Sequence, residues 1–215
     1  MHGKQNLRYI ILLGWLSWVS VPCVAQVEDN RENFRIGFKA GFNNSNVYDE
    51  AGDQFVANSK TGFAFGGYMC IPFDRTVGFQ PEVLVSQKGF DASGMYFGNS
   101  YNFTRTTTYL DIPLQLQVKA SPALSFVLGP QYSYLMKTRD EFGNGTISLV
   151  QEQQITEDNY RKNILGFVIG GDVHLNSFIL SARAGWDITK NHGDGTSSNP
   201  RYKNHWLQLM AGIEF

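Results

Sequence analysis

The chain has 215 residues and a formal net charge of −1, with 18 lysines and arginines against 19 aspartates and glutamates. This length suits one domain of ordinary size. Aromatic residues make up 14% of the chain, and it contains 22 glycines and only 7 prolines, a composition that favours strands. The basic residues are spread along the chain and form no stripe, so we expect no nucleic-acid partner.

The first 25 residues differ in character from the rest. Lys4 and Arg8 precede an apolar run at residues 9–21, and small residues follow at 23–25. This is the pattern of a secretory signal peptide, and the apolar run is too short and wrongly flanked for a membrane-spanning helix. We therefore predict that residues 1–25 are a signal peptide and that the mature chain is exported.

Cleavage is expected after Ala25, which makes Gln26 the first mature residue and leaves residues 26–215 as one β-barrel domain. The alternative is a lipoprotein signal that ends at Cys23. Pro22 stands where that signal requires a small residue, so we favour ordinary cleavage.

Apolar and polar residues alternate along most of the mature chain. At residues 110–119 every even position is Leu, Ile or Val, whereas Asp, Gln and Lys occur at odd positions. A period of two is the mark of an amphipathic strand. The alternation predicts eight strands, at residues 34–43, 60–71, 75–90, 101–119, 122–138, 159–175, 177–189 and 202–215.

The connections between these strands alternate in length. Short turns are expected at 72–74, at 121–122 and at Asn176, whereas longer connections are expected at 44–59, 91–100, 139–158 and 190–201. Outer-membrane barrels have short periplasmic turns and longer external loops. We therefore predict an all-β fold, an eight-stranded antiparallel up-and-down transmembrane β-barrel, whose loop 139–158 extends as a hairpin through Ile147, Leu149 and Val150.

Each predicted strand has one apolar face and one face of charged residues and glycines. If the apolar face pointed inward, the chain would be a soluble, lipocalin-like carrier of apolar ligands. The glycines favour the opposite arrangement, because an eight-stranded barrel has little interior space and needs small residues among large polar ones. Aromatic residues near strand ends suit interfacial girdles: Phe34, Phe42, Tyr132, Tyr134, Trp186 and Trp206.

Several local motifs resemble those of one family. They are Gly37–Asn43, Gly62–Gly66, Glu82–Gly89, Tyr109–Leu114 and Leu128–Pro130. Over nearly all of the mature part, the chain resembles the PorT-like family of outer-membrane β-barrel domain proteins. The resemblance implies a short eight-stranded barrel in the outer membrane of a Gram-negative bacterium, with no catalytic residues to carry over.

The resemblance also implies partners. Phe215 looks like the terminal aromatic residue by which the barrel-assembly machinery recognises its clients. Outer-membrane lipid surrounds such barrels, and one member of the family is tied to protein secretion and gliding, so envelope or secretion-system proteins are further expected partners. We expect a monomer that binds no cofactor.

The inward charges form the main candidate site. They are Arg35, Lys39, Glu82, Lys88, Asp111, Asp172, Arg183, Asp187 and Glu214. Unpaired charges in a narrow lumen would be costly, whereas paired and hydrogen-bonded charges persist. We predict a structural network that plugs the barrel. The alternative is a polar permeation path or a small-solute site, although eight strands leave no aqueous channel.

Two weaker candidates concern chemistry. His174 lies two residues from Asp172 on the same strand face, and Ser125 or Ser181 could complete a hydrolase-like set. His192, Asp194 and His205 could be metal ligands. We expect neither site. The predicted function is that of a non-enzymatic, plugged scaffold that acts through external loops or envelope partners; the alternatives are an outer-membrane enzyme that modifies lipid or peptide, and the soluble carrier.

Overall fold

A computed structural model of the chain describes residues 29–48, 57–96, 99–144, 147–154, 162–190 and 203–215. The predicted signal peptide and its cleavage between Ala25 and Gln26 lie outside these residues. The described part of the chain is built from β-strands, and it has no helix long and apolar enough to cross a bilayer.

Nine strands follow one another along the described part of the chain. They are β1 (Arg35–Tyr48), β2 (Ala57–Pro72), β3 (Val77–Tyr96), β4 (Asn99–Ser121), β5 (Leu124–Asn144), β6 (Ile147–Gln154), β7 (Asn163–Leu175), β8 (Phe178–Asp187) and β9 (Lys203–Glu214).

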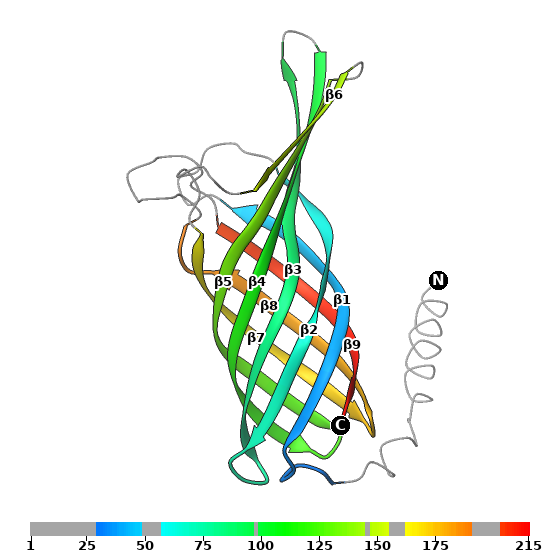
Figure 1. Cartoon of the computed structure of the whole chain (residues 1–215), viewed down its shortest axis with the longest axis vertical. Helices are drawn as coiled ribbons and strands as arrows, with labels where there is room; N and C mark the ends of the chain where they lie inside the picture. Colours follow the sequence, from blue (N-terminus) through cyan, green and yellow to red (C-terminus); the bar gives the residue numbers. More distant parts are fainter. Residues whose placement is uncertain (1–28, 49–56, 97–98, 145–146, 155–161, 191–202) are drawn as a thin grey trace, which may run out of the picture.

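Eight of these strands close into an antiparallel barrel (Figure 1). Each strand from β1 to β4 pairs with the next, β5 pairs with β7, and β9 closes the ring by pairing with β1. Closure leaves no free edge in the ring. The predicted eight-stranded antiparallel barrel is confirmed, and the additional strand β6 pairs with β5 outside the ring.

The two ends of the barrel differ. At one end the strand pairs are joined by the short segments 73–76, 122–123 and 176–177, and β1 begins and β9 ends there; we call this the turn end. Asn176 has a φ of 57°, a left-handed conformation that asparagine tolerates in two-residue hairpin turns. The opposite end is the loop end.

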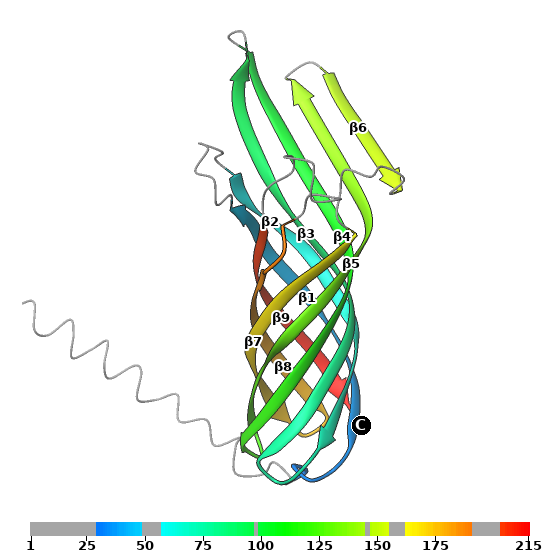
Figure 2. The same cartoon turned by 90° about the vertical axis from the view of Figure 1, so that its left-hand side faces the viewer.

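A sheet of four strands projects beyond the ring at the loop end (Figures 1 and 2). This protruding sheet consists of residues 90–96, 99–105, 137–144 and 147–154, in the order β3, β4, β5, β6. The predicted hairpin within 139–158 is confirmed. The predicted loop at 91–100 was wrong, because β3 and β4 stay paired as far as Tyr96 and Asn99; the polar sequence of this stretch lacks the alternation that identified the other strands.

Side chains alternate between the lumen and the outer surface as the sequence predicts. On β1, Phe38 is 63% exposed, whereas the next residue, Lys39, is 3% exposed. Trp206 departs from the predicted aromatic girdle, since it lies in the lumen with only 3% of its surface exposed. Its position explains this, because Trp206 has the same parity on β9 as the inward residues Asn204 and Gln208.

Candidate functional site

The structure places all nine predicted lumen charges inside the barrel, and none is more than 9% exposed. All but Asp187 divide into a central cluster, a loop-end cluster and a turn-end cluster. The central cluster is Lys39, Glu82, Asp172 and Arg183; the loop-end cluster is the pair Lys88 and Asp111; the turn-end cluster is Arg35 and Glu214. Asp187 is bound separately, by Asn204.

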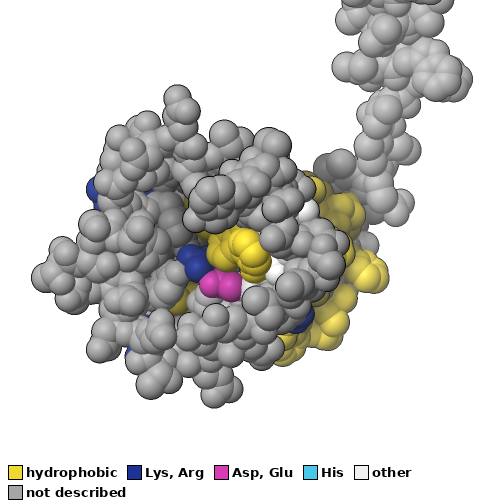
Figure 3. Space-filling view, turned by 90° about the horizontal axis from the view of Figure 1, so that it is seen from above, with side chains coloured by type: hydrophobic (Ala, Val, Ile, Leu, Met, Phe, Trp, Pro, Cys, Tyr) yellow, Lys and Arg dark blue, Asp and Glu magenta, His cyan; other side chains and the backbone are white. Residues whose placement is uncertain are grey.

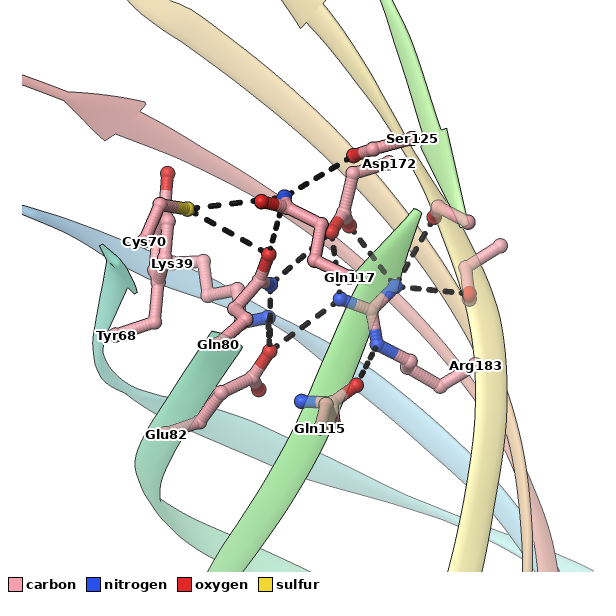
Figure 4. Close-up of polar contacts among 12 residues, drawn as sticks. Lys39, Tyr68, Cys70, Gln80, Glu82, Gln115, Gln117, Ser125, Asp172 and Arg183 are labelled. Carbon is pink, nitrogen blue, oxygen red and sulfur yellow. Dashed lines mark hydrogen bonds and ion pairs between the residues drawn. The ribbon is translucent and has the colours of Figure 1, made fainter. Parts of the chain in front are cut away.

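The central cluster balances two cations against two anions (Figure 4). The Arg183 guanidinium lies 2.8 Å from the Asp172 carboxylate and 3.3 Å from the Glu82 carboxylate. Lys39 Nζ donates to Glu82 Oε1 at 2.6 Å, and Gln80 bridges the two carboxylates at 3.0 and 3.1 Å. Each charge therefore has a partner of opposite sign, which is the condition for keeping charges in a water-poor interior.

The loop-end cluster surrounds one ammonium group. Lys88 Nζ lies 3.1 Å from Asp111 Oδ2, which also accepts a hydrogen bond from Ser86 Oγ at 2.5 Å. The same ammonium lies 3.7 Å from the centroid of the Trp206 ring and 4.9 Å from that of Tyr109. Cation–π attraction adds to the ion pair when such a group is desolvated, so Lys88 is held from several sides.

Asp187 has a different environment. Its Oδ2 accepts hydrogen bonds from the backbone nitrogen of Asn204 at 3.1 Å and from the Asn204 side chain at 2.6 Å. Its Oδ1 has no hydrogen-bond partner among the described residues. Asp187 is thus bound by an amide residue of the neighbouring strand, without a cation at ion-pair distance in the described part of the chain.

The turn-end cluster is centred on Glu214. Arg35 Nη1 lies 2.5 Å from Glu214 Oε1, and the Tyr68 hydroxyl donates to Oε2 at 3.0 Å. His174 Nδ1 lies 2.9 Å from Oε1, and His174 Nε2 lies 2.9 Å from Ser125 Oγ. In the neutral imidazole with its proton on Nδ1, His174 donates to Glu214 and accepts from Ser125. A serine, a histidine and a carboxylate therefore form one chain.

This geometry changes the membership of the candidate hydrolase-like set. The sequence suggested Asp172 as the carboxylate partner of His174, but Asp172 is held by Arg183. Glu214 takes the place of Asp172, and Ser125 is the serine that reaches the imidazole. Asp172 and His174 lie two residues apart on one face of β7. Nevertheless, Asp172 belongs to the central cluster, whereas His174 contacts Glu214 of the turn-end cluster.

Uncharged amides link the clusters, and the charge-based prediction did not include them. Gln117 Nε2 donates to Gln80 Oε1 at 2.7 Å and to Ser125 Oγ at 3.2 Å, which connects the central cluster to the turn end (Figure 4). Nearer the loop end, Gln208 donates to Asn43 at 2.7 Å. In the alternation of their strands these residues occupy positions that face the lumen, and this is the sequence signal that could have identified them.

The N-terminal segment 29–34 crosses the turn end. Asp29 lies 2.8 Å from Arg31 and 2.5 Å from Arg75 in the β2–β3 turn, and these two guanidinium groups hold the pKa of the Asp29 carboxyl well below its usual range. Lys119 donates to the backbone oxygen of Arg31 and to that of Asp74. A hollow of 290 Å³ remains at this end, lined by Asn30, Asn33, Phe34, Arg35, Asn176, Ser177, Glu214 and Phe215.

At the loop end, Figure 3 shows a hollow in which acidic, basic and hydrophobic side chains are visible. No group of three or more His, Cys, Asp or Glu residues in the described part of the chain could hold a metal ion. Of the candidate metal ligands, which we did not expect to form a site, His192 and Asp194 lie outside the described residues, and His205 is on the outer surface of β9. The described site is therefore the polar network of the lumen.

The sequence comparison agrees with the barrel fold. The family described as "Outer membrane protein beta-barrel domain" matches residues 24–193. The chain belongs to this family. As an outer membrane protein beta-barrel domain, it lies in the outer membrane. Outer-membrane barrels have their short turns on the periplasmic side, which is the side we expect for the turn end.

Solved structures show a likeness in fold at low sequence identity. The chain is similar to Ail, the attachment invasion locus protein of Yersinia pestis (13% identity, 84% of this chain and 98% of that chain covered, TM-score 0.46). It is also similar to Neisserial surface protein A (11%, 85% and 97%, 0.44) and to OprG from Pseudomonas aeruginosa (14%, 84% and 95%, 0.38). A search of curated proteins found no match.

Proposed function

We propose that this protein is a plugged outer-membrane scaffold of the PorT-like type, which acts through its protruding sheet and external loops by binding envelope partners. The paired charges of the lumen carry the first part of the proposal, because they fill the interior with groups that satisfy one another. The protruding sheet carries the second part, since it places a large structured surface beyond the ring.

The plug is inferred from how far the network extends along the lumen. Clusters of bound charges lie at three levels of the lumen, and amides such as Gln80 and Gln117 connect them. To open a path, the barrel would have to separate pairs such as Lys39–Glu82, which are 2.6 Å apart and almost fully buried. Separation of a buried pair leaves an uncompensated charge, at a cost of about 3–5 kcal/mol. Bulk diffusion through the lumen is therefore not its role.

The protruding sheet has one face with aromatic and charged residues. Arg105 holds Asp140 with two hydrogen bonds, at 2.7 and 2.6 Å, and its guanidinium lies 5.1 Å from the centroid of the Phe103 ring. Phe142, paired with Phe103 across the sheet, is 41% exposed. Arginine and aromatic residues are enriched in protein interfaces, so this face is the favoured contact surface.

The edge of the same sheet offers a second contact. β6 pairs with β5 on one side, and its other edge has no partner strand among the described residues. Exposed edges accept further strands unless lysine, proline or a bulge guards them. The β6 sequence, ISLVQEQQ, contains neither lysine nor proline. An extended segment of a partner can therefore add to the sheet at β6.

A planar-bilayer experiment tests the plug. The purified barrel should give no sustained porin-sized openings, and an Arg183→Ala variant should give more frequent transient openings, because Glu82 and Asp172 lose their shared cation. Sustained openings in the unmodified protein would overturn the plugged scaffold.

A photo-crosslinking experiment in growing cells tests the contact surface. A photoreactive amino acid at Phe142, on the protruding sheet, should give a discrete protein adduct, whereas the same group at Phe178, an outward residue at the turn end, should give none. Arg105→Glu should weaken the adduct at Phe142, because it removes the ion pair with Asp140. Absence of an adduct at Phe142, or an identical one at Phe178, would contradict the proposal.

A second candidate function rests on the chain of Ser125, His174 and Glu214. The two 2.9 Å contacts give the order of nucleophile, base and orienting carboxylate found in serine acyl hydrolases. In this function His174 accepts the Ser125 proton as Oγ attacks an ester carbonyl, and returns it to the leaving alcohol. Against it stands the burial of Ser125, which is 1% exposed.

An alkyl fluorophosphonate distinguishes this candidate from the scaffold. An enzyme would carry the phosphonyl adduct on Ser125, and His174→Ala would abolish that adduct. Ser86 is the matched control, because its hydroxyl is equally buried but bonds Asp111 and no histidine. If Ser125 stays unlabelled in the folded barrel, the hydrolase candidate is removed.

A further inference from the structure

Three neighbouring strand pairings of the ring are interrupted, each at a proline. Between β2 and β3 the ladder stops at Tyr68–Glu82 and resumes at Ile71–Phe79, with Pro81 in the gap. The ladder of β3 and β4 stops at Pro81–Leu114 and resumes at Leu84–Asp111, with Pro113 in the gap. The ladder of β4 and β5 stops at Pro113–Gln131 and resumes at Leu116–Leu128, with Pro130 in the gap.

These gaps have a simple cause. Proline has no N–H group to donate to the ladder and is therefore rare in central strands. The register is the same on both sides of each gap, so no residue has been inserted. The other five pairings of the ring run without such a gap over their paired residues. One side of the barrel wall, from β2 to β5, thus has a break beside a proline in each of three neighbouring ladders, and the β2–β3 ladder is broken a second time between Ser59 and Ala64, where the register shifts.

An apolar groove lies over the first two gaps, on the outer surface. It has a volume of 320 Å³, and its lining includes Ile36, Phe38, Gly67, Met69, Val83 and Ile112. Its floor is Gly67, which pairs with Phe38 on one side and Val83 on the other. A Cβ atom on Gly67 would lie 3.5 Å from the Phe38 ring, an ordinary contact, so the groove exists because a side chain is absent there.

The position of the groove indicates what fills it. Ile36 is the second residue of β1 and Met69 lies near the end of β2, which puts the groove in the turn-end half of the wall. In the outer membrane this half faces the periplasmic leaflet. Surface voids lose dispersion contacts until an apolar group occupies them, and the interrupted backbone in lipid must be shielded from water.

A cation lies in the turn that follows one strand of the groove. Arg75 is in the short segment that joins β2 to β3, two of the strands that line the groove, and its side chain is 63% exposed. It is bound to Asp29 through Nη2, and arginine has further donors that match a phosphate group. A phospholipid could therefore place its phosphate near Arg75 while its chain enters the groove.

We propose that this groove binds one acyl chain of a phospholipid of the periplasmic leaflet, as an ordered ligand rather than as exchanging bulk lipid. Gly67 provides the space, the proline gaps let the wall yield to the chain, and Arg75 binds the headgroup. The lipid completes the wall at its interrupted side. This inference concerns the outer surface and is independent of the plugged lumen.

The test uses the full barrel in vesicles of phosphatidylethanolamine and phosphatidylglycerol that contain a phosphatidylethanolamine with a diazirine in its acyl chain. After irradiation, mass spectrometry should locate about tenfold more adducts at Met69, Val83 and Ile112 than at Val173 and Leu180, outward residues on the opposite side. Gly67→Leu fills the groove and should remove that excess.

The control is Gly171→Leu, at an outward glycine of β7 whose Cβ would also have only ordinary contacts. It should leave the adduct pattern unchanged, and heat-modifiability on a gel should show that both variants are folded. An even distribution of adducts around the barrel, or an excess at the groove that survives Gly67→Leu, would overturn the proposal. If Arg75→Ala removes the excess of adducts at the groove, Arg75 binds the lipid headgroup. If the excess persists in this variant, Arg75 does not bind the headgroup.

Discussion

His174 bonds Glu214 on β9, at 2.9 Å, although Asp172 lies two positions away on the same face of its own strand. Only β8 separates β7 from β9 in the ring, so His174 can reach Glu214, and Arg183 already binds the Asp172 carboxylate at 2.8 Å. Residues that alternate correctly on one strand can therefore belong to separate clusters.

Glu214→Gln should change the environment of the His174 ring, whereas Asp172→Asn should not. The first substitution removes the charged acceptor of Nδ1; the second breaks a pair that involves Arg183. Nitrogen-15 spectra of the histidine side chain should show a shifted Nδ1 resonance in the first variant and the original one in the second. Equal shifts in both variants would mean that the two clusters are one unit.

Lys88→Met should destabilise the barrel strongly. It removes the ion pair with Asp111 and the contact with the Trp206 ring, and it leaves Asp111 buried without a cation. The free energy of unfolding should fall by about 3–5 kcal/mol, measured by urea titration in vesicles with tryptophan fluorescence.

Arg75→Met is the matched control for Lys88→Met, because it also replaces a paired cation by methionine. Its pair with Asp29 is exposed at the turn end, and exposed ion pairs contribute little to stability. If both variants lose the same stability, burial is not what makes the Lys88 pair important.

The barrel could be predicted from the sequence because alternation along a strand and the formation of a short turn depend on residues close together in the chain. Alternation at residues such as Ile36, Phe38 and Lys39 decides which side chains face outward, and the two-residue turn at Asn176 has a clear sequence signal. Trp206 was misplaced because its size suggested a girdle, although its parity on β9 was that of the lumen.

The connections within the lumen could not be predicted, because they depend on register and on how far each strand is displaced along the barrel. The strand faces identify Ser125, His174 and Glu214 as inward residues, but not that they lie at one level. Similarly, Pro81, Pro113 and Pro130 are visible as single residues, whereas their alignment in neighbouring strands appears only in the pairing.

Gly41→Ala should destabilise the barrel, whereas Gly143→Ala should be nearly neutral. A Cβ atom on Gly41 would lie 1.9 Å from the backbone oxygen of Leu209, and backbone cannot move aside as a flexible side chain can. Overpacking of this kind costs about 1–3 kcal/mol. A Cβ on Gly143, in the protruding sheet, has no described atom within 4 Å. Equal urea midpoints for the two variants would contradict the close approach at Gly41.

Asp74 should make the stability of the turn end depend on pH. Its carboxylate accepts hydrogen bonds from the backbone nitrogens of Val77, at 2.7 Å, and Thr76, at 2.5 Å. These donors lower the pKa of Asp74 below the ordinary value of 3.8. Because the folded pKa is the lower one, the ionised group stabilises the fold above pH 3.8, and this contribution is lost as the pH falls through the folded pKa.

Asp74→Asn measures this contribution, since it keeps an acceptor oxygen and removes the charge. At about pH 6 the urea midpoint of the unmodified protein should be higher than that of the variant. This difference should shrink below pH 3.8 as Asp74 becomes protonated. If the gap between the unmodified protein and Asp74→Asn widens on acidification, the sign of the effect is wrong, and the two backbone hydrogen bonds are not what the charge supports.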